Sequence, residues 1–238
     1  MIALSESLLK VESLEVYIGF LHILRGIDLE INRGEIVCLL GRNGAGKTTT
    51  IKAIIGLRKT ARGRIMFDGI DITHLPPEKR VLMGIGYQPE DVKIFPDLTV
   101  KENIDIPLIV RHVRDRNRVY ETIYKIFPEV KDLLHRRGSQ LSGGQRKMVA
   151  IARALAYDPK IVLLDEPFEG LAPIVVNRIF KAFQDMRKEG ISILYAESNI
   201  RTINIADKVY IIERGEIMFH GTPEEIMSNE QILKIVGR

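Results

Sequence analysis

The sequence of 238 residues has one cysteine and no long hydrophobic run. A single cysteine, Cys38, cannot form a disulfide within the chain, so a reducing compartment fits, and we expect Cys38 to be a small buried side chain. The apolar runs are far shorter than the roughly 18 residues that span a bilayer, so any link to a membrane must pass through a partner. Residues 1–10 lack the basic start and long apolar stretch of a signal peptide, and we expect none.

Several functional signatures are also missing. The net charge is only +4, and Asp115 interrupts the densest basic stretch, residues 111–118, so we expect no nucleic-acid partner. The five histidines are scattered, without the Cys/His spacing of a zinc site. A hydrolase elbow of the G-x-S-x-G type is absent, and so is the N-K-x-D guanine motif of GTPases.

What the sequence does contain is a series of short apolar runs separated by longer helical patterns. The runs at 36–40, 161–164, 192–196 and 209–212 have the character of strands buried on both faces, as in a parallel sheet. Apolar residues at helical spacing occupy 146–156, and a second helix is expected from Pro173 to Gly190. Strands alternating with helices predict a mainly parallel α/β layer structure.

Other regions depart from this pattern. The first 35 residues contain much polar–apolar alternation, which predicts antiparallel strands at an edge or on a small separate sheet. Residues 98–157 have almost no strand signal and are predicted to form a helical insert. Near the C-terminus we expect a hairpin that turns at Arg214 and Gly215. A helix should follow, with Thr222 as N-cap, Pro223 at its first position and Glu225 closing a capping box.

The segment GRNGAGKT at residues 41–48 matches the phosphate-binding pattern G-x-x-x-x-G-K-[ST] and directly follows an apolar run. Its glycines let the backbone wrap closely with N–H groups turned inward, and the following helix points its N-terminus at the anion. Lys47 is expected to reach the β- and γ-phosphates of a nucleotide, and the Thr48 hydroxyl to bind Mg²⁺. A simple glycine-rich turn is the alternative, which the flanking strand and helix disfavour.

Two adjacent carboxylates, Asp165 and Glu166, end the apolar run at 161–164. Like charges side by side repel, and unpaired buried charge is costly, so a cation or a chemical task is expected there. In P-loop NTPases an Asp at such a strand end holds Mg²⁺ together with the phosphate-loop Thr. We therefore assign Asp165 to the metal and Glu166 to orienting and polarising the attacking water.

The segment LSGGQRK at residues 141–147 opens the helix predicted at 146–156, with Ser142 as its N-cap. Two glycines allow a ligand to approach the backbone, and the start of this helix is a second helix N-terminus suited to bind an anion. With GRNGAGKT, LSGGQ and IVLLDEP in this order, the chain resembles the ATP-binding subunits of ABC transporters over nearly its whole length. LSGGQ is the signature of that family.

The resemblance implies a RecA-like P-loop NTPase fold, with a mainly parallel sheet core, an N-terminal antiparallel β subdomain and a helical insert. It implies one ATP-binding domain over residues 1–238, with a catalytic core at about 1–96 and 158–238 and a helical signature subdomain at about 97–157. It also implies ATP and Mg²⁺ as cofactors. Because two such domains pair head to tail in the family, the signature residues of one chain are expected to act on the ATP of the other.

The resemblance assigns the family's functional positions to individual residues of this chain. The catalytic set is Glu166, Lys47 and Ser198. The metal set is Thr48, Glu90 and Asp165. The nucleotide-binding set is Tyr17, Gly41, Arg42, Asn43, Gly44, Ala45, Gly46, Lys47, Thr48 and Thr49, with Ser142, Gly143, Gly144 and Gln145 acting across the dimer. Tyr17 matches an adenine-stacking position, and a strand aromatic on a core face is its alternative role.

Three positions depart from the commonest family pattern. Glu90 stands where a Gln usually precedes a segment such as 94–96, although Gln88 lies two residues earlier. Ser198 replaces the family's switch histidine, and Ala172 stands where an Asp often precedes Pro173. Because serine cannot carry a positive charge at neutral pH, we expect a working but slow ATPase.

With the segments EGLAP and IFPDLTVKEN, these departures resemble the ATP-binding subunits of branched-chain amino-acid importers. We therefore predict an importer ATPase at the cytoplasmic face of the membrane, working with transmembrane permease subunits, a second ATP-binding subunit and a substrate-binding protein. The permease is expected to dock near residues 90–107. An exporter ATPase for lipid or lipopolysaccharide is the nearest alternative, because DEPFEG and GIGYQPE also resemble that group. A soluble ABC-type ATPase, a P-loop GTPase and a small-molecule kinase fit the sequence less well.

Overall fold

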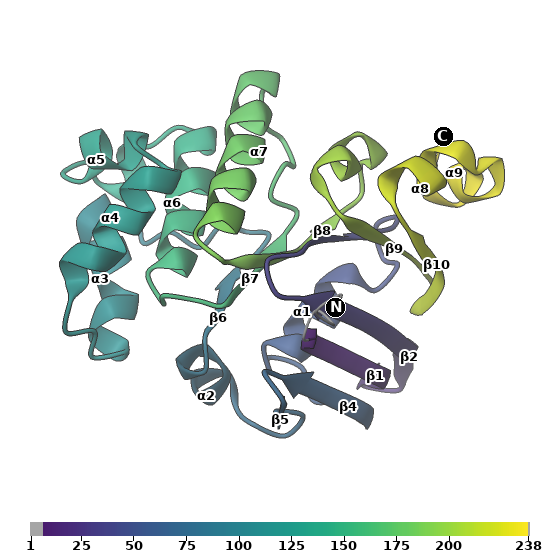
Figure 1. Cartoon of the computed structure of the whole chain (residues 1–238). Coiled ribbons are helices and arrows are strands. Elements are labelled where there is room, and N and C mark those ends of the chain that lie inside the picture. The colour runs from purple at the N-terminus through teal and green to yellow at the C-terminus, as the bar shows by residue number, and fades with distance from the viewer. Residues whose placement is uncertain (1–6, 238) are drawn as a thin grey trace, which may run out of the picture.

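The computed structural model (Figure 1) describes residues 7–237, so the expectation for residues 1–10 falls largely outside it. Within that range the chain folds around a six-stranded sheet. In order across this sheet lie β10 (Glu216–Gly221), β9 (Lys208–Glu213), β3 (Ile36–Leu40), β8 (Ser192–Glu197), β7 (Ile161–Asp165) and β6 (Ile85–Gln88). β10 runs antiparallel to β9, and all other neighbours are parallel.

The predicted apolar runs form the buried centre of this sheet. Every residue of β3, β7 and β8 is buried. Parallel strands that are covered on both faces have such continuous apolar sequences, and the predicted mainly parallel α/β core is confirmed. Because Leu40 pairs with Glu197, and Asp165 with Ala196, the loops that follow β3, β7 and β8 emerge side by side at one edge.

A second sheet is antiparallel, in the order β2 (Leu21–Asn32), β1 (Ser7–Ile18), β4 (Arg62–Phe67) and β5 (Ile70–Asp71). The antiparallel strands predicted for the first 35 residues are thus confirmed for β1 and β2. Strands β4 and β5 were not predicted from the sequence. Their hairpin turns at Asp68 and Gly69, whose φ angles of 52° and 76° suit a two-residue turn.

The predicted helical insert contains α3 (Val100–Val110), α4 (Arg116–Ile126), α5 (Glu129–Leu133), a 3₁₀ turn (Gly138–Gln140) and α6 (Gly143–Leu155). Figure 1 shows these helices gathered on one side of the six-stranded sheet, together with α7 (Pro173–Lys188). Helix α6 begins earlier than the apolar pattern indicated because Ser142 caps it in a capping box with Gln145. Helix α7 ends before Gly190, which adopts φ 79°.

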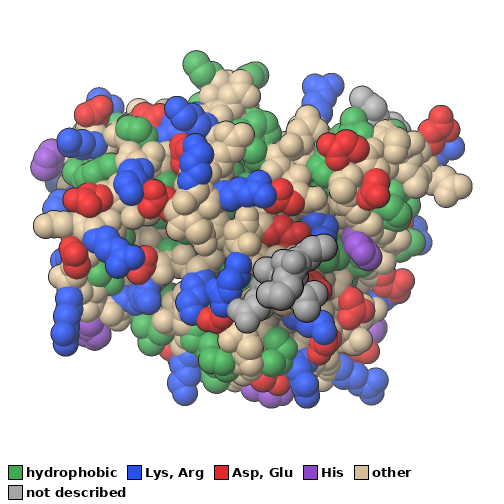
Figure 2. Space-filling model, viewed as in Figure 1, with side chains coloured by type: hydrophobic (Ala, Val, Ile, Leu, Met, Phe, Trp, Pro, Cys, Tyr) green, Lys and Arg blue, Asp and Glu red, His purple; other side chains and the backbone are tan. Residues whose placement is uncertain are grey.

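The C-terminal predictions are also confirmed. The β9–β10 hairpin turns at Arg214 and Gly215, both with positive φ. Helix α8 (Pro223–Ser228) carries the predicted capping box between Thr222 and Glu225, and α9 (Glu230–Val236) follows. Across residues 7–237 no helix is both long and apolar enough to cross a membrane. On the face shown in Figure 2, Lys and Arg side chains are interspersed with Asp and Glu.

The six-stranded sheet separates two hydrophobic cores. Along β3, Val37 and Leu39 face the core shared with the antiparallel sheet and α1 (Lys47–Ile54). Ile36, Cys38 and Leu40 face the core shared with the helical insert, and Cys38 is fully buried as expected. This alternation follows from the two-residue period of a strand. Helix α1, which starts in the phosphate loop, is therefore fixed against both sheets.

Helix α2 (Pro77–Leu82) was not predicted from the sequence, and its Arg80 is one of the largest fully buried side chains. The guanidinium donates hydrogen bonds of 2.7–2.8 Å to the carbonyls of Ala53, Ile54, Thr73 and Leu75. Burial lowers the pKa of Arg80 to about 10, so it remains charged at neutral pH. Because Ala53 and Ile54 end α1, Arg80 satisfies carbonyls that a helix C-terminus leaves without intrahelical partners.

Candidate functional site

The phosphate loop joins β3 to α1 and is held by neighbouring backbone. The Gly41 N–H donates to the Glu197 carbonyl at the end of β8 (3.1 Å), and the Gly215 N–H donates to the Ala45 carbonyl (2.8 Å). Gly46, with φ 117°, is the N-cap of α1 and gives the helix no side-chain cap. The first N–H groups of α1 are therefore available to an anion. Gly215 was predicted only as a hairpin residue, and no local pattern indicates its contact with this loop.

Lys47 is buried at the start of α1. Its ammonium donates to the carbonyls of Gly41 (2.9 Å) and Arg42 (3.3 Å), and it lies 3.0 Å from Oε1 of Glu166. Both members of this ion pair are less than a tenth exposed. The structure therefore brings the predicted phosphate-binding lysine into direct contact with the predicted general base, as a buried ion pair.

Asp165 ends β7 fully buried, next to the phosphate loop. Its Oδ1 accepts a hydrogen bond from the Thr48 hydroxyl (3.0 Å), while its Oδ2 has no hydrogen-bond partner. Burial raises the pKa of Asp165 to about 6; the Thr48 hydroxyl opposes this rise and the nearby Glu90 carboxylate adds to it. A buried carboxylate oxygen without a partner is costly unless a cation binds it.

These groups fit Mg²⁺. The ion prefers oxygen ligands and is usually held by one or two carboxylates together with phosphate oxygens. Thr48 and Asp165 place a hydroxyl and a carboxylate side by side. Among the described residues no group of three or more His, Cys, Asp or Glu side chains converges as a metal site. Mg²⁺ bound beside Thr48 and Asp165 would take its remaining ligands from water and from phosphate oxygens of a nucleotide.

A cavity of about 420 Å³ surrounds the phosphate loop. Glu90 lines this cavity, as the metal assignment requires. Gln88, the alternative, is fully buried at the end of β6 beside Leu164, and its Oε1 has no hydrogen-bond partner. Position therefore favours Glu90 as the residue that meets a nucleotide. Predicted residues that line the cavity are Asn43, Gly44, Gly46, Lys47, Thr48, Thr49, Glu90 and Glu166.

Glu166 adopts φ 47°, in the left-handed region that a non-glycine residue seldom occupies. Its N–H donates to the Ala196 carbonyl (3.0 Å), and its Oε2 accepts from the Ser198 hydroxyl at 3.4 Å. Ser198 therefore contacts the predicted general base directly. Glu197, which was not predicted from the sequence, is a buried side chain whose Oε1 accepts from the Phe168 N–H (2.9 Å). Burial and the neighbouring Glu166 carboxylate raise the pKa of Glu197.

Tyr17 lies near the end of β1 and is 47% exposed, so it is not a core aromatic. Its ring stacks on His22 with centroids 4.2 Å apart and planes 6° apart. Residues of the same hairpin that line the phosphate-loop cavity are Ile18 and Ile23. The hairpin therefore reaches the cavity, while adenine stacking by Tyr17 stays a prediction.

The signature segment forms the start of α6. The Ser142 hydroxyl accepts from the Gln145 N–H, and Gln145 Oε1 accepts from the Ser142 N–H. Gly143 faces open space, whereas a Cβ on Gly144 would lie 3.0 Å from Val175 of α7. Gly143 thus leaves room for a ligand, and Gly144 allows close helix packing. In the described part of the chain these residues do not line the phosphate-loop cavity.

Lys47, Thr48 and Asp165 meet at one edge of a parallel sheet, which is the architecture of a P-loop nucleotide-binding protein. A family model described as ABC transporter matches residues 24–169. The lipopolysaccharide export system ATP-binding protein LptB of Haemophilus influenzae is 40% identical, covering 96% of each chain. The high-affinity branched-chain amino acid transport ATP-binding protein BraG of Pseudomonas aeruginosa is 33% identical, covering 94% of this chain and 97% of its own.

Solved structures give the same result. An ATP-binding cassette of an ABC transporter in its ADP conformation has a TM-score of 0.84 at 30% identity, covering 98% of this chain and 100% of its own. A dimeric cassette in a post-hydrolysis state with ADP and Pi has a TM-score of 0.81 at 26% identity, covering 90% and 98%. The chain belongs to the ABC transporter ATP-binding family. Members hydrolyse ATP with Mg²⁺, dimerise and work with transmembrane permease subunits, so the predicted ATPase activity and cofactors are confirmed.

Replacing Asp165 with Asn should stabilise the metal-free protein at neutral pH. The folded pKa of about 6 exceeds the ordinary value of 3.8, so ionising this buried carboxyl destabilises the fold. The penalty is absent below pH 4 and complete above pH 6, where it amounts to on the order of 3 kcal/mol. Asparagine avoids the penalty because its side chain does not ionise, and its amide oxygen can still accept the hydrogen bond from Thr48. The thermal unfolding midpoint in a chelator, measured from pH 4 to 8, should favour the variant increasingly with pH.

The same Asp165→Asn variant should lose the stabilisation that MgATP gives to the wild type, because the metal loses a carboxylate ligand. A stability difference that is independent of pH would contradict the assignment of the penalty to Asp165. Retained stabilisation by MgATP would contradict its assignment to the metal.

Proposed function

We propose that this chain is the ATP-hydrolysing subunit of an importer for branched-chain or other amino acids, at the cytoplasmic face of a membrane. The position of Glu90 carries this proposal. It lines the phosphate-loop cavity and lies near enough to Asp165 for its charge to raise the pKa of that carboxyl. Glu90 and Ser198 stand at positions where branched-chain importer subunits also depart from the commoner Gln and His. Glu90 lines the phosphate-loop cavity and Ser198 contacts the Glu166 carboxylate, so both lie close to the proposed chemistry.

In this function Glu166 orients and polarises the water that attacks the γ-phosphate. Lys47 and Ser198 contact its carboxylate from two sides, at 3.0 and 3.4 Å, which fixes the direction of its oxygens. The Lys47 ammonium offsets negative charge that develops on the phosphoryl oxygens. Mg²⁺, when held by Asp165 and its neighbours, supplies further neutralisation of that charge. Ser198 offers a hydrogen bond without a charge, which is consistent with slow turnover.

The proposed active unit is a head-to-tail dimer in which the signature helix of one chain closes the nucleotide site of the other. The open surface at Gly143 and the N-terminus of α6 provide an anion-binding end that lies outside the chain's own phosphate-loop cavity. An occupied dimer therefore has two composite sites. The division into a core at 1–96 and 158–238 and a signature subdomain at 97–157 is part of the same proposal.

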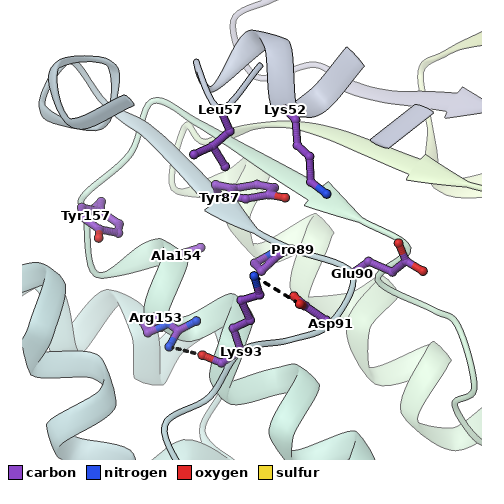
Figure 3. A pocket seen from close by; sticks show the side chains of 10 residues that line it. All are labelled: Lys52, Leu57, Tyr87, Pro89, Glu90, Asp91, Lys93, Arg153, Ala154 and Tyr157. Atoms are coloured by element: carbon purple, nitrogen blue, oxygen red, sulfur yellow. Dashed lines mark hydrogen bonds and ion pairs between the residues drawn. The ribbon is translucent and has the colours of Figure 1, made fainter. Parts of the chain in front are cut away.

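The membrane permease is proposed to dock in a groove of about 470 Å³ between the end of α1, the segment after β6 and the end of α6 (Figure 3). Leu57, Tyr87, Pro89 and Ala154 give it apolar surface, and charged residues surround them. Arg153 holds the segment after β6 by donating to the Lys93 carbonyl (2.7 Å). The groove includes Glu90, so a docked partner and a bound nucleotide meet at one segment.

A lipopolysaccharide exporter is the second candidate function. It is favoured by the 40% identity to the Haemophilus influenzae export protein over 96% of both chains. In an importer of this type a substrate-binding protein completes the complex, whereas an exporter has no need of one. The two candidates share the ATPase chemistry and differ in their membrane partners.

Replacing Glu166 with Gln should leave ATP binding intact and lower kcat about 100- to 10,000-fold, because the general base is lost. Dimers should accumulate with MgATP, as seen by size-exclusion chromatography. Glu224→Gln, an exposed change on α8, is the control and should behave like the wild type. Turnover that survives in the Glu166→Gln variant would remove this residue from the role of base.

Ser142→Arg and Lys47→Ala chains should each be inactive alone, yet regain activity when mixed. In a head-to-tail pair, the Ser142→Arg chain supplies an intact phosphate loop and the Lys47→Ala chain an intact signature. At equal concentrations about a quarter of the wild-type rate is expected from one intact site in half of the dimers. Steady-state ATPase assays over a range of mixing ratios measure this. No recovery at any ratio would contradict action across the dimer.

Leu57→Glu should abolish copurification of membrane subunits, because it buries a charge in the docking groove, while the ATPase rate of the isolated chain stays unchanged. Ile70→Glu, with similar exposure (54% against 51%) but outside the groove, is the matched control. The captured partners also decide between the functions. A permease with a binding protein, and stimulation by a branched-chain amino acid, supports the importer; a lipid-handling membrane partner supports the exporter; ribosomes or nucleic acid contradict both.

A further inference from the structure

A second buried lysine, Lys147, lies beside the general base. It belongs to α6, two residues after Gln145, and is only 4% exposed. Its ammonium donates a 2.7 Å hydrogen bond to the backbone carbonyl of Glu166. The signature helix of each chain is thus attached directly to the residue that the proposed function uses as a base in the same chain.

This hydrogen bond acts on a strained backbone. A non-glycine residue at φ 47° costs on the order of 1 kcal/mol or more, so Glu166 needs surrounding contacts to hold that conformation. On the side of β8, the Ala196 carbonyl accepts from the Glu166 N–H, and the Glu197 carboxyl accepts from the Phe168 N–H. On the side of α6, Lys147 holds the carbonyl. Rotation of this peptide would redirect the side chain that faces Lys47.

The surroundings of Lys147 are acidic. Burial lowers the pKa of Lys147, and the carboxylates of Glu197, Glu169, Glu166 and Asp165 oppose that effect in decreasing order. A charged donor to a carbonyl in a dry environment makes a shorter and stronger hydrogen bond than a neutral donor. Lys147 therefore combines a strong hydrogen bond with compensation of the buried acidic charge.

We propose that Lys147 is a positioning residue for hydrolysis, which holds the Glu166 backbone in its left-handed conformation and so aims the Glu166 carboxylate at the phosphate-loop cavity of its own chain. This inference rests on the proposed function, in which Glu166 is the base. Lys147 is not among the residues that line the phosphate-loop cavity. It acts through Glu166 and within one chain, even though the helix that carries it closes the site of the other chain.

The first test compares Lys147→Met, which keeps length but removes charge and donor, with the conservative Lys147→Arg. Lys147→Met should lower kcat about 10- to 100-fold, as small misplacements of a catalytic group do, while the affinity for a fluorescent ATP analogue stays within about twofold. Lys147→Arg should recover part of the loss. Lys188→Met, an exposed change on α7, is the control. An unchanged kcat in Lys147→Met would overturn the proposal.

The second test separates positioning of Glu166 from damage to the signature helix. Lys147→Met is added to one member of the Ser142→Arg and Lys47→Ala mixture. In the Ser142→Arg chain, whose Glu166 serves the intact site, it should lower the recovered rate about tenfold or more. In the Lys47→Ala chain, which supplies only the signature helix, the rate should remain within about twofold. Equal losses in both, or a loss only in the Lys47→Ala chain, would overturn action through Glu166.

A double-mutant cycle covers the case in which mixing restores no activity. In a Glu166→Gln background, Lys147→Met should have little further effect on the residual single-turnover rate, because two residues that act as one unit are not additive. Full additivity would overturn the proposal. A wild-type chain without MgATP hydrolysis would instead contradict the proposed function, so the two failures are distinguishable.

Discussion

The nucleotide site depends on one buried ion pair, between the Lys47 ammonium and the Glu166 carboxylate. Removing two charges from water is expensive, and apolar residues of similar size would stabilise a fold at least as well. The pair can form because β3 and β7 lie on either side of β8 and end at the same edge of the sheet. The charges that destabilise the fold are thus those that the proposed chemistry requires, and in this structure each compensates the other.

Features that depend on residues close together in the sequence could be predicted, whereas features that depend on contacts between distant residues could not. Contiguous motifs encode the phosphate loop, the strand-end carboxylates and the Ser142 cap. Each of them could therefore be predicted from a few neighbouring residues. The contact of Gly215 with the phosphate loop and the role of Glu197 were not predicted, because their partners, Ala45 and Phe168, lie far away along the chain. Helix α2 and the β4–β5 hairpin were missed because both are short, and tertiary contacts rather than periodicity support them.

The relatives of this chain include a lipopolysaccharide export protein and a branched-chain amino acid transport protein. In the proposed complexes the transported molecule stays with the membrane subunits, so the residues around Lys47 and Asp165 have the same task in both. In this proposal, selectivity for one transporter depends on the docking groove, whose exposed residues include Leu57, Asp91 and Lys93. Glu90 differs from the other groove residues because it lines both the groove and the phosphate-loop cavity.

Helix α6 is a rod of 13 residues, about 20 Å long, and three different surfaces meet along it. In the proposed dimer, Ser142 and Gly143 at its start face a partner chain. Lys147 follows and donates to the Glu166 carbonyl, and Arg153 and Ala154 at the far end line the proposed docking groove. An α-helix is stiff along its axis, so a push on the groove end shifts all three together. In the proposed complex, one helix thus joins the membrane-facing groove to the backbone of the proposed base.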